Sequence, residues 1–264
     1  MKTRTLALLA SLLTVSACGG SADTSTPEGT VAASYAYMAD GFDLAGMITT
    51  VAAPSQLADL EADWNEAMKE GPSPDEAMEF RALMLMLTAD DAEEQLFIQA
   101  KPMLAEMQQS LTGAAGLITL AGMSAVSAEL DEEEQQQYQA VLGGMATWLG
   151  ELDITDEDKA KESIGILCAA ARELGITSLD QVQALGFEEA LERGGIALGS
   201  VMDVFKVYGL DLESVFEGAV IGEAVIDGTA AKVPVTLRMF GEDYEFMQAL
   251  KLVDGKWYAD TGAE

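Results

Sequence analysis

The sequence predicts a predominantly helical α+β fold, in which a long multi-helix body over residues 31–214 precedes a four-stranded antiparallel meander over residues 215–264. Three observations predict this division. Helix-capping residues, and apolar residues three and four apart, recur up to about residue 212. From about residue 215, apolar residues instead alternate with polar ones. Turn sequences that contain glycine then divide the segment into strands that can pair in sequence order and pack on the helices. Residues 31–214 and 215–264 can form two domains or a single one.

The composition favours a folded protein and excludes several functions. Of the 264 residues 49% are apolar, enough for a large core despite 45 acidic against 14 basic residues. The formal net charge of −31 repels phosphate backbones, so we expect no nucleic-acid partner. The chain has no histidine, which excludes Ser-His-Asp and Cys-His catalysis and imidazole metal sites. We expect no cofactor and no metal site.

The N-terminal residues have the order of a secretory signal peptide, which we assign to residues 1–17. Lys2 and Arg4 precede a short apolar run over residues 6–15, and small residues precede Cys18. The apolar run is about half as long as the ~20 residues that a transmembrane helix requires. We therefore expect the segment to be cleaved rather than retained as a membrane span.

The segment Val15-Ser16-Ala17-Cys18 resembles the lipobox of bacterial lipoproteins. The resemblance implies that a signal peptidase recognises Val15, Ser16 and Ala17 and that Cys18 receives diacylglyceryl and acyl chains. Such chains hold a protein on the membrane, because each buried CH2 contributes about 0.8 kcal/mol. In that family, Gly19 after the cysteine implies the outer membrane, facing the periplasm, in Gram-negative cells. Ordinary secretion with a free Cys18 is the alternative.

Residues 18–30 are predicted to form the lipidated cysteine and a flexible tether, since residues 19–26 contain no large apolar side chain. Removal of Lys2 and Arg4 with the leader takes the formal charge from −31 to −33. Once Cys18 is acylated, Cys168 has no disulfide partner within the chain. Cys168 lies on an apolar helix face, which predicts a buried and inert thiol.

Acidic clusters in the body are predicted to be helix N-termini, where carboxylates interact favourably with the helix dipole. Thr26-Pro27-Glu28 begins the first helix in this way. The same signal recurs at Ser73-Pro74-Asp75-Glu76, Thr88-Ala89-Asp90-Asp91, Asp131-Glu132-Glu133-Glu134, Thr155-Asp156-Glu157-Asp158 and Ser178-Leu179-Asp180-Gln181. A carboxylate calcium site is the alternative, although the chain has no EF-hand loop sequence.

Apolar stripes predict which helices form the core. The stripes Leu57-Leu60-Trp64-Met68 and Phe80-Leu83-Met84-Leu87 both have helical spacing. The uncharged segment 107–128 is rich in small and polar residues, so we expect a buried central helix rather than a membrane span. Pro102 is expected to begin or kink this helix, and Gly175 to end a later one.

Three turns are predicted in the meander, at Asp227-Gly228, Gly241-Glu242 and Asp254-Gly255. Closing the hairpins there pairs Glu223 with Lys232, Arg238 with Glu245, Leu237 with Phe246, and Leu252 with Trp257. The face predicted to be covered by helices comprises Val220, Val233, Val235, Leu237, Phe246, Leu250, Leu252 and Trp257. Pro234 indicates an edge strand or an outward-facing position, because it has no N–H to donate.

The closing segment 250–258, Leu-Lys-Leu-Val-Asp-Gly-Lys-Trp-Tyr, resembles the final hairpin of nuclear-transport-factor-like α+β domains of bacterial envelope proteins. Residues 26–43 resemble the first helix of that family less closely. The resemblance implies that the helical middle is an insertion and that the concave sheet face can form a ligand pocket. It implies no particular activity, since such domains often lack catalysis.

These features predict a lipid-anchored envelope protein with a non-catalytic binding or assembly role. Its expected partners are the membrane, through Cys18, and an envelope protein or a small apolar ligand. One alternative is a carrier of a lipid or small apolar ligand. The other is a cell-wall glycan enzyme that uses carboxylates, since Glu162-Ser163 resembles the catalytic pair of lytic transglycosylases but lacks their downstream Gly-Leu-Met-Gln element. A nucleophile elbow and a phosphate loop are missing from the sequence, so we expect no enzyme and no catalytic residue.

Overall fold

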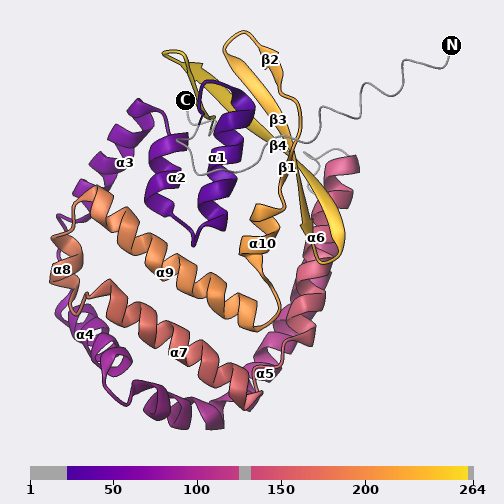
Figure 1. Ribbon diagram of the computed structural model, residues 1–264. Helices are drawn as coiled ribbons and strands as arrows, with labels where there is room; N and C mark the ends of the chain where they lie inside the picture. Colours follow the sequence, from indigo (N-terminus) through magenta and orange to yellow (C-terminus); the bar gives the residue numbers. More distant parts are fainter. Residues whose placement is uncertain (1–22, 125–131, 261–264) are drawn as a thin grey trace.

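The computed structural model describes residues 23–124 and 132–260, and within them it has the predicted α+β architecture, mainly α (Figure 1). The helices are α1 (Pro27–Ala39), α2 (Leu44–Val51), α3 (Pro54–Ala67), α4 (Pro74–Thr88), α5 (Ala92–Ser124), α6 (Glu132–Glu151), α7 (Glu157–Leu174), α8 (Leu179–Gln183), α9 (Phe187–Val207) and α10 (Leu212–Glu217). The strands are β1 (Val220–Ile221), β2 (Val225–Asp227), β3 (Ala230–Met239), β4 (Glu242–Val253) and β5 (Lys256–Ala259). The signal peptide and the lipobox, Val15-Ser16-Ala17-Cys18, lie outside the described residues, as does Asp131.

Local capping determines where several helices begin and end. Thr26 accepts a hydrogen bond from the Gly29 amide at 3.1 Å, so α1 begins at Pro27, within the range predicted to be tether. Ser73 and Ser178 form reciprocal capping boxes at α4 and α8, as predicted. Gly175 ends α7 in the left-handed conformation, with φ of 64°. These signals are local, which is why the sequence predicted them.

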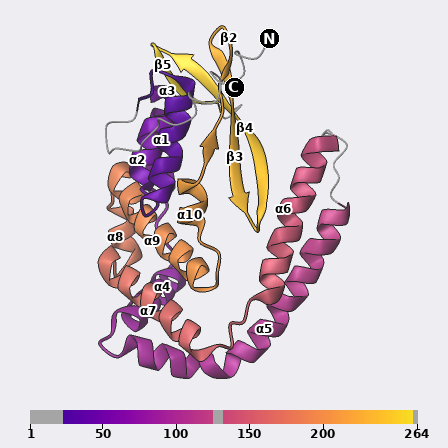
Figure 2. The same cartoon turned by 45° about the vertical axis from the view of Figure 1, so that its right-hand side comes forward.

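Helices α7 and α9 run antiparallel at the centre of the helical body (Figure 1). Helices α4 and α5 pack on α7, while α2 packs on α9. Helix α1 contacts α2, α10 and the sheet, and so joins the two parts of the fold. The pair α5 and α6 stands beside the rest as a two-helix arm in Figure 2. Its α6 helix meets the β3–β4 hairpin, where a Cβ on Gly144 would approach the Phe240 ring to 2.4 Å.

The sheet is wholly antiparallel, with the order β1-β3-β4-β5 and with β2 also paired to β3. The predicted first strand is therefore broken into β1 and β2, which both lie on the same side of β3. Pro234 lies opposite the break, where its carbonyl accepts from the Gly222 amide at 2.8 Å. A Cβ on Gly222 would come within 2.6 Å of the Pro234 ring. The register directs the nitrogen of Pro234 toward β1 and β2 rather than toward β4, at the point where β1 ends, so the missing N–H removes no hydrogen bond to β4.

Two of the three predicted hairpin registers are wrong by two residues. The structure pairs Val225 with Lys232, rather than Glu223 with Lys232, and Leu237 with Tyr244, rather than with Phe246; likewise Arg238 pairs with Asp243 and not with Glu245. The second turn is at Phe240 and Gly241, which both have positive φ, as a type I′ turn requires. The third hairpin has the predicted pairing of Leu252 with Trp257. A shift of two residues retains the sheet faces, so the alternation remained informative.

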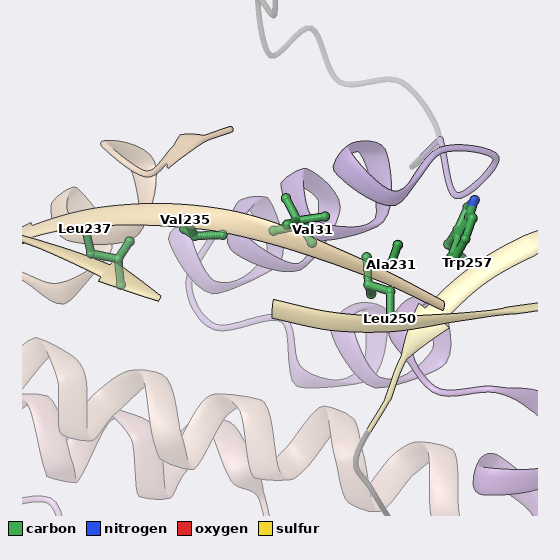
Figure 3. Close-up of a cluster of buried hydrophobic side chains, with 7 residues drawn as sticks. Val31, Ala231, Val235, Leu237, Leu250 and Trp257 are labelled. Atoms are coloured by element: carbon green, nitrogen blue, oxygen red, sulfur yellow. The ribbon is translucent and has the colours of Figure 1, made fainter. Parts of the chain in front are cut away.

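The core lies where α1 covers one face of the sheet (Figure 3). Of the predicted face, the buried members are Val233, Val235, Leu237, Leu250 and Trp257, and Leu252 packs partly against them. Val220 is 60% exposed, because it pairs with Thr236 and lies on the opposite face. Phe246 is 37% exposed, at a point where β5 does not extend beside β4. The sheet therefore has one covered face and one open face.

Helix α5 differs from its prediction. It is a continuous helix of 33 residues with Pro102 in its interior, so Pro102 does not begin it. Met107 is 48% exposed, and the polar residues that follow it are largely exposed, so the described part of segment 107–128 is not a buried central helix. Gln108 is a partly buried residue of α5. Its side-chain amide donates to the Leu152 carbonyl at 2.7 Å and accepts from the Ile154 amide at 2.9 Å. No helix within the described residues has the length and apolar character that a membrane crossing requires.

The two predicted apolar stripes are only partly buried. Met84 is 5% exposed and Trp64 donates its indole N–H to the Leu185 carbonyl at 3.2 Å. Leu60 and Leu83, however, are 42% and 46% exposed. The exposed apolar side chains of α4 also include Met78, Leu85 and Met86. Helical spacing predicted the stripe but not how far a neighbour covers it.

Cys168 is fully buried in α7, as predicted. Burial raises the pKa of its thiol, and the nearby Glu93 carboxylate adds to this effect. Arg172, one turn further along, bonds to Glu93 at 2.5 Å and to the Ala89 carbonyl at 2.9 Å. The thiol is thus protonated and enclosed, which is the condition of an inert structural cysteine.

Leu250→Ala is expected to lower the free energy of unfolding by about 2–5 kcal/mol, because it leaves a cavity beneath α1. Urea unfolding followed by circular dichroism measures the change. Leu85→Ala, at a position that is 57% exposed, is the matched control and is expected to change stability by no more than about 0.5 kcal/mol. Equal losses for both variants would contradict the assignment of the core to the α1–sheet contact.

Candidate functional site

A cleft of about 560 Å³ lies between the α1–α2 loop, α7, α9 and α10. Its volume falls within the range of small-ligand sites in proteins. Apolar residues form part of the lining: Phe42, Leu44, Ile166, Ala169, Ala170 and Ile196. Carboxylates form the rest of its chemistry: Asp40, Asp43, Glu173, Glu192, Asp203 and Glu213. Within residues 23–124 and 132–260 no lysine or arginine lines it, so we call it the acidic cleft.

The α1–α2 loop forms one wall of the acidic cleft and has an unusual backbone. Gly41 and Phe42 both have positive φ, of 63° and 61°. Glycine adopts this region readily, but a bulky residue such as Phe42 is rarely found there. Asp43 then caps α2 by accepting the Gly46 amide at 2.8 Å. The sharp turn brings Asp40 and Asp43 to the cleft from the two ends of the loop.

Glycines on α9 let the loop approach closely. A Cβ on Gly199 would lie 2.9 Å from the Gly41 carbonyl oxygen, and one on Gly195 would lie 3.0 Å from the Phe42 carbonyl oxygen. Both distances are shorter than ordinary contacts. The absence of side chains at these positions therefore determines the distance between the loop and α9, and with it the width of the acidic cleft.

Aromatic packing holds the loop on its other side. The Phe42 ring packs edge-on against Phe216 of α10, with ring centroids 5.9 Å apart. Phe216 also packs against Tyr35 of α1, at 6.1 Å. Burial raises the pKa of the Tyr35 hydroxyl, so this phenol stays protonated. Three elements thus fix the strained Phe42, which is the condition under which such a conformation persists.

Electrostatic repulsion is evident at the α9–α10 end of the acidic cleft. Asp203 remains in contact with solvent, yet its packed surroundings raise the pKa of its carboxyl, and the nearby Glu213 raises it further. Lys206 partly offsets this effect, but it is already bonded to Glu213 at 3.0 Å and to Asp211 at 3.2 Å. The site therefore has an excess of negative charge that its own cation does not neutralise.

The arrangement favours recognition of positive charge. Among the described residues, no group of three or more acidic or cysteine side chains is placed to hold a metal ion. The Ser200 hydroxyl, which lines the cleft, donates to the Ala197 carbonyl of its own helix at 2.7 Å. The acidic cleft can therefore offer carboxylates to a cationic group and an apolar surface to whatever carries that group.

The residues named from the sequence do not meet at this site. Cys18 and residues 15–17 lie outside the described residues, and Glu162 is exposed on α7, outside the cleft lining. Ser163 is buried, and its hydroxyl has no hydrogen-bond partner in the part of the chain that the structure describes. The acidic cleft was not predicted from the sequence. The spacing of Gly195 and Gly199, one turn apart on a helix, was the signal that could have indicated a close approach.

The chain matches no protein-family model, no curated protein and no solved structure. The resemblances to bacterial lipoproteins and to nuclear-transport-factor-like domains thus stay predictions. The geometry of the acidic cleft and the chemistry of its lining are the basis for assigning a function.

Glu213→Gln is expected to lower the pKa of the Asp203 carboxyl, because it removes a neighbouring negative charge. A raised carboxyl pKa means that ionisation is less favourable in the folded state, so Asp203 withdraws stability as the pH rises above its ordinary pKa. The variant should therefore lose less stability over that pH range. Side-chain carbon NMR during a pH titration measures the shift. Glu217→Gln, outside the cleft, is the control, and an unchanged Asp203 titration in Glu213→Gln would contradict the coupling.

Proposed function

We propose that the chain is a lipid-anchored protein of the bacterial cell envelope that acts by binding rather than by catalysis. The ordered leader, with Val15-Ser16-Ala17 before Cys18, supports the anchor. The Thr24 carbonyl accepts from the Trp257 amide of β5, so residues 19–23 alone separate Cys18 from the folded body. At ~3.3 Å per extended residue, this tether reaches at most roughly 17 Å. The body is thereby held close to the membrane surface.

The acidic cleft is the observation that carries the binding role. Its carboxylates surround an apolar surface that includes Ile166 and Ile196, and no cationic side chain of the described residues lines it. A complementary ligand has a positive charge, such as an amine or guanidinium, joined to a small apolar part. The net charge of −31 increases the local concentration of cations and so favours their capture.

The two alternative functions have no specific structural feature in their favour among the described residues. A carrier of a lipid or other apolar ligand needs an enclosed apolar cavity, whereas this cleft is open and rimmed by carboxylates. For a glycan enzyme, Glu162 and Ser163 would have to lie in one catalytic site. They do not face a common site, because Glu162 is exposed and Ser163 is buried. A non-catalytic binding role is therefore the function that the site supports best.

The anchor predicts a specific mass. Protein isolated from its native host is expected to begin at Cys18 and to carry diacylglyceryl and acyl groups, measured by intact mass spectrometry. Cys18→Ala should abolish the added mass and release the protein from the membrane fraction, because durable attachment depends on the buried acyl chains. Cys168→Ala changes the other cysteine and should leave the lipid in place. An unmodified chain that begins at residue 18 would contradict the proposal.

The binding role predicts selectivity for charge. Hexylamine, which joins an amine to an apolar chain, is expected to bind the purified protein more tightly than hexanoate, its anionic counterpart. Asp203→Asn should weaken hexylamine binding about fivefold, since one charge pair in water-like surroundings contributes about 1 kcal/mol. Isothermal titration calorimetry measures the affinities. Asp227→Asn, on exposed β2, is the control, and equal effects of the two substitutions would rule out the acidic cleft as the site.

A further inference from the structure

Strand β4 has a partner strand along most of one side but along only a short part of the other. On its first side, β3 pairs with every residue from Glu242 to Lys251. On its second side, β5 pairs only with residues from Leu250 to Val253. Within the described residues, the second side of β4 therefore has no strand partner before Ala249. This feature is separate from the acidic cleft and does not depend on it.

The register determines which main-chain groups point to the unpaired side. The Leu252 amide donates to the Thr229 carbonyl at 2.7 Å, so even-numbered residues of β4 direct their hydrogen-bonding groups to β3. Odd-numbered residues direct theirs to the other side, and the Ala249 carbonyl indeed accepts from the Asp260 amide at 2.9 Å. Asp243, Glu245 and Met247 consequently present one N–H and one C=O each, which we call the open edge.

Strands β3 and β5 each have a second neighbour. The second side of β3 is occupied by β1 and β2. The outer side of β5 meets the N-terminal segment, since the Trp257 amide donates to the Thr24 carbonyl at 2.9 Å. An exposed strand edge with unsatisfied main-chain groups is a template for another extended chain. The open edge of β4 is such a template.

The side chains around the open edge specify the chemistry of an added strand. Glu242, Asp243 and Glu245 are exposed carboxylates, while Phe246 and Met247 are exposed apolar residues, at 37% and 53%. Cross-strand pairs of opposite charge are favourable, as are apolar pairs. A strand that alternates lysine or arginine with apolar residues complements both sets.

A second copy of this chain does not complement the open edge. Two copies each carry a formal charge of −31, so their approach is opposed by long-range repulsion. An antiparallel pairing of two β4 strands centred on Glu245 would also place this carboxylate opposite its own copy. Like charges directly opposite each other destabilise a strand pair. The acidic side chains thus disfavour self-association while attracting a basic segment.

We propose that the open edge of β4, at Asp243, Glu245 and Met247, is a docking site for an extended basic peptide segment of a partner protein, which adds to the sheet as an antiparallel strand.

The test uses a peptide of alternating lysine and valine, about eight residues long, which spans the open edge at ~3.3 Å per residue. Amide hydrogen exchange of the purified protein is followed by NMR at physiological ionic strength. The peptide should slow exchange of the Asp243, Glu245 and Met247 amides by about tenfold, because a ladder amide exchanges only when the ladder opens. The same peptide methylated on its main-chain amide nitrogens should give no protection. A glutamate–valine peptide should give none either.

Two variants separate docking at the open edge from general attraction to an acidic protein. Glu245→Lys should weaken binding of the lysine–valine peptide about tenfold, which corresponds to 1.4 kcal/mol, whereas Glu223→Lys makes the same charge change on another part of the sheet and should not. Met247→Pro removes an open-edge N–H without removing a bond to β3, and should abolish protection while circular dichroism stays unchanged.

Three outcomes would overturn the proposal. The methylated peptide could bind as tightly as the parent, which would exclude main-chain pairing. The two lysine variants could lower affinity equally, which would indicate charge attraction alone. The amides of the open edge could already be protected in the free protein, with sedimentation showing a dimer, which would identify a second copy as the occupant. The methylated-peptide comparison remains decisive even if Met247→Pro fails to fold.

Discussion

The contact between α1 and the C-terminal sheet is the constraint on which the rest of the structure depends. Thr30 is completely buried, and its hydroxyl donates to the Trp257 carbonyl at 3.1 Å, across 227 residues of sequence. Beside it, Val31 packs on the sheet core, and Glu28 accepts the Ala224 amide at 2.8 Å. Because α1 is fixed in this way, the loop that follows it lies against α9, where it forms a wall of the acidic cleft. The same contact covers one face of the sheet, and β4 with its open edge belongs to that sheet.

Two arginines are used at joints between helices. Arg172 joins α7 to the α4–α5 turn, and it holds the pKa of Glu93 at about 2, well below its usual range. Arg193 of α9 donates to the Leu174 carbonyl at 2.7 Å and so caps the end of α7. Exposed ion pairs contribute little stability by themselves, so the value of these residues lies in positioning helix ends. At the acidic cleft and the open edge, carboxylates outnumber their cationic neighbours, which are Lys206 and Arg238.

Much of the secondary structure was predictable because its causes are local. Ser73 and Ser178 cap helices through bonds to residues three positions away, and Gly175 adopts the left-handed conformation that few other residues accept. The turn at Asp254 and Gly255 needs only its own two residues. The second hairpin was misplaced, since its turn uses Phe240, a bulky residue that is rarely found at positive φ. Its position is determined by α6, where the closely approached Gly144 accommodates the Phe240 ring.

By itself, then, the sequence determined the class of fold, the helix boundaries with clear caps, the alternation of the sheet faces and the burial of Cys168. Each of these depends on residue type and on spacing along the chain, and the proposed leader before Cys18 rests on the same kind of signal. Only the tertiary structure decided which apolar stripes are covered, as the exposure of Leu83 shows, and where the acidic cleft forms. It also decided that β5 ends short of the open edge. These features depend on contacts between segments far apart in the chain, such as Phe42 with Phe216, and periodicity within one segment carries no information about its partner.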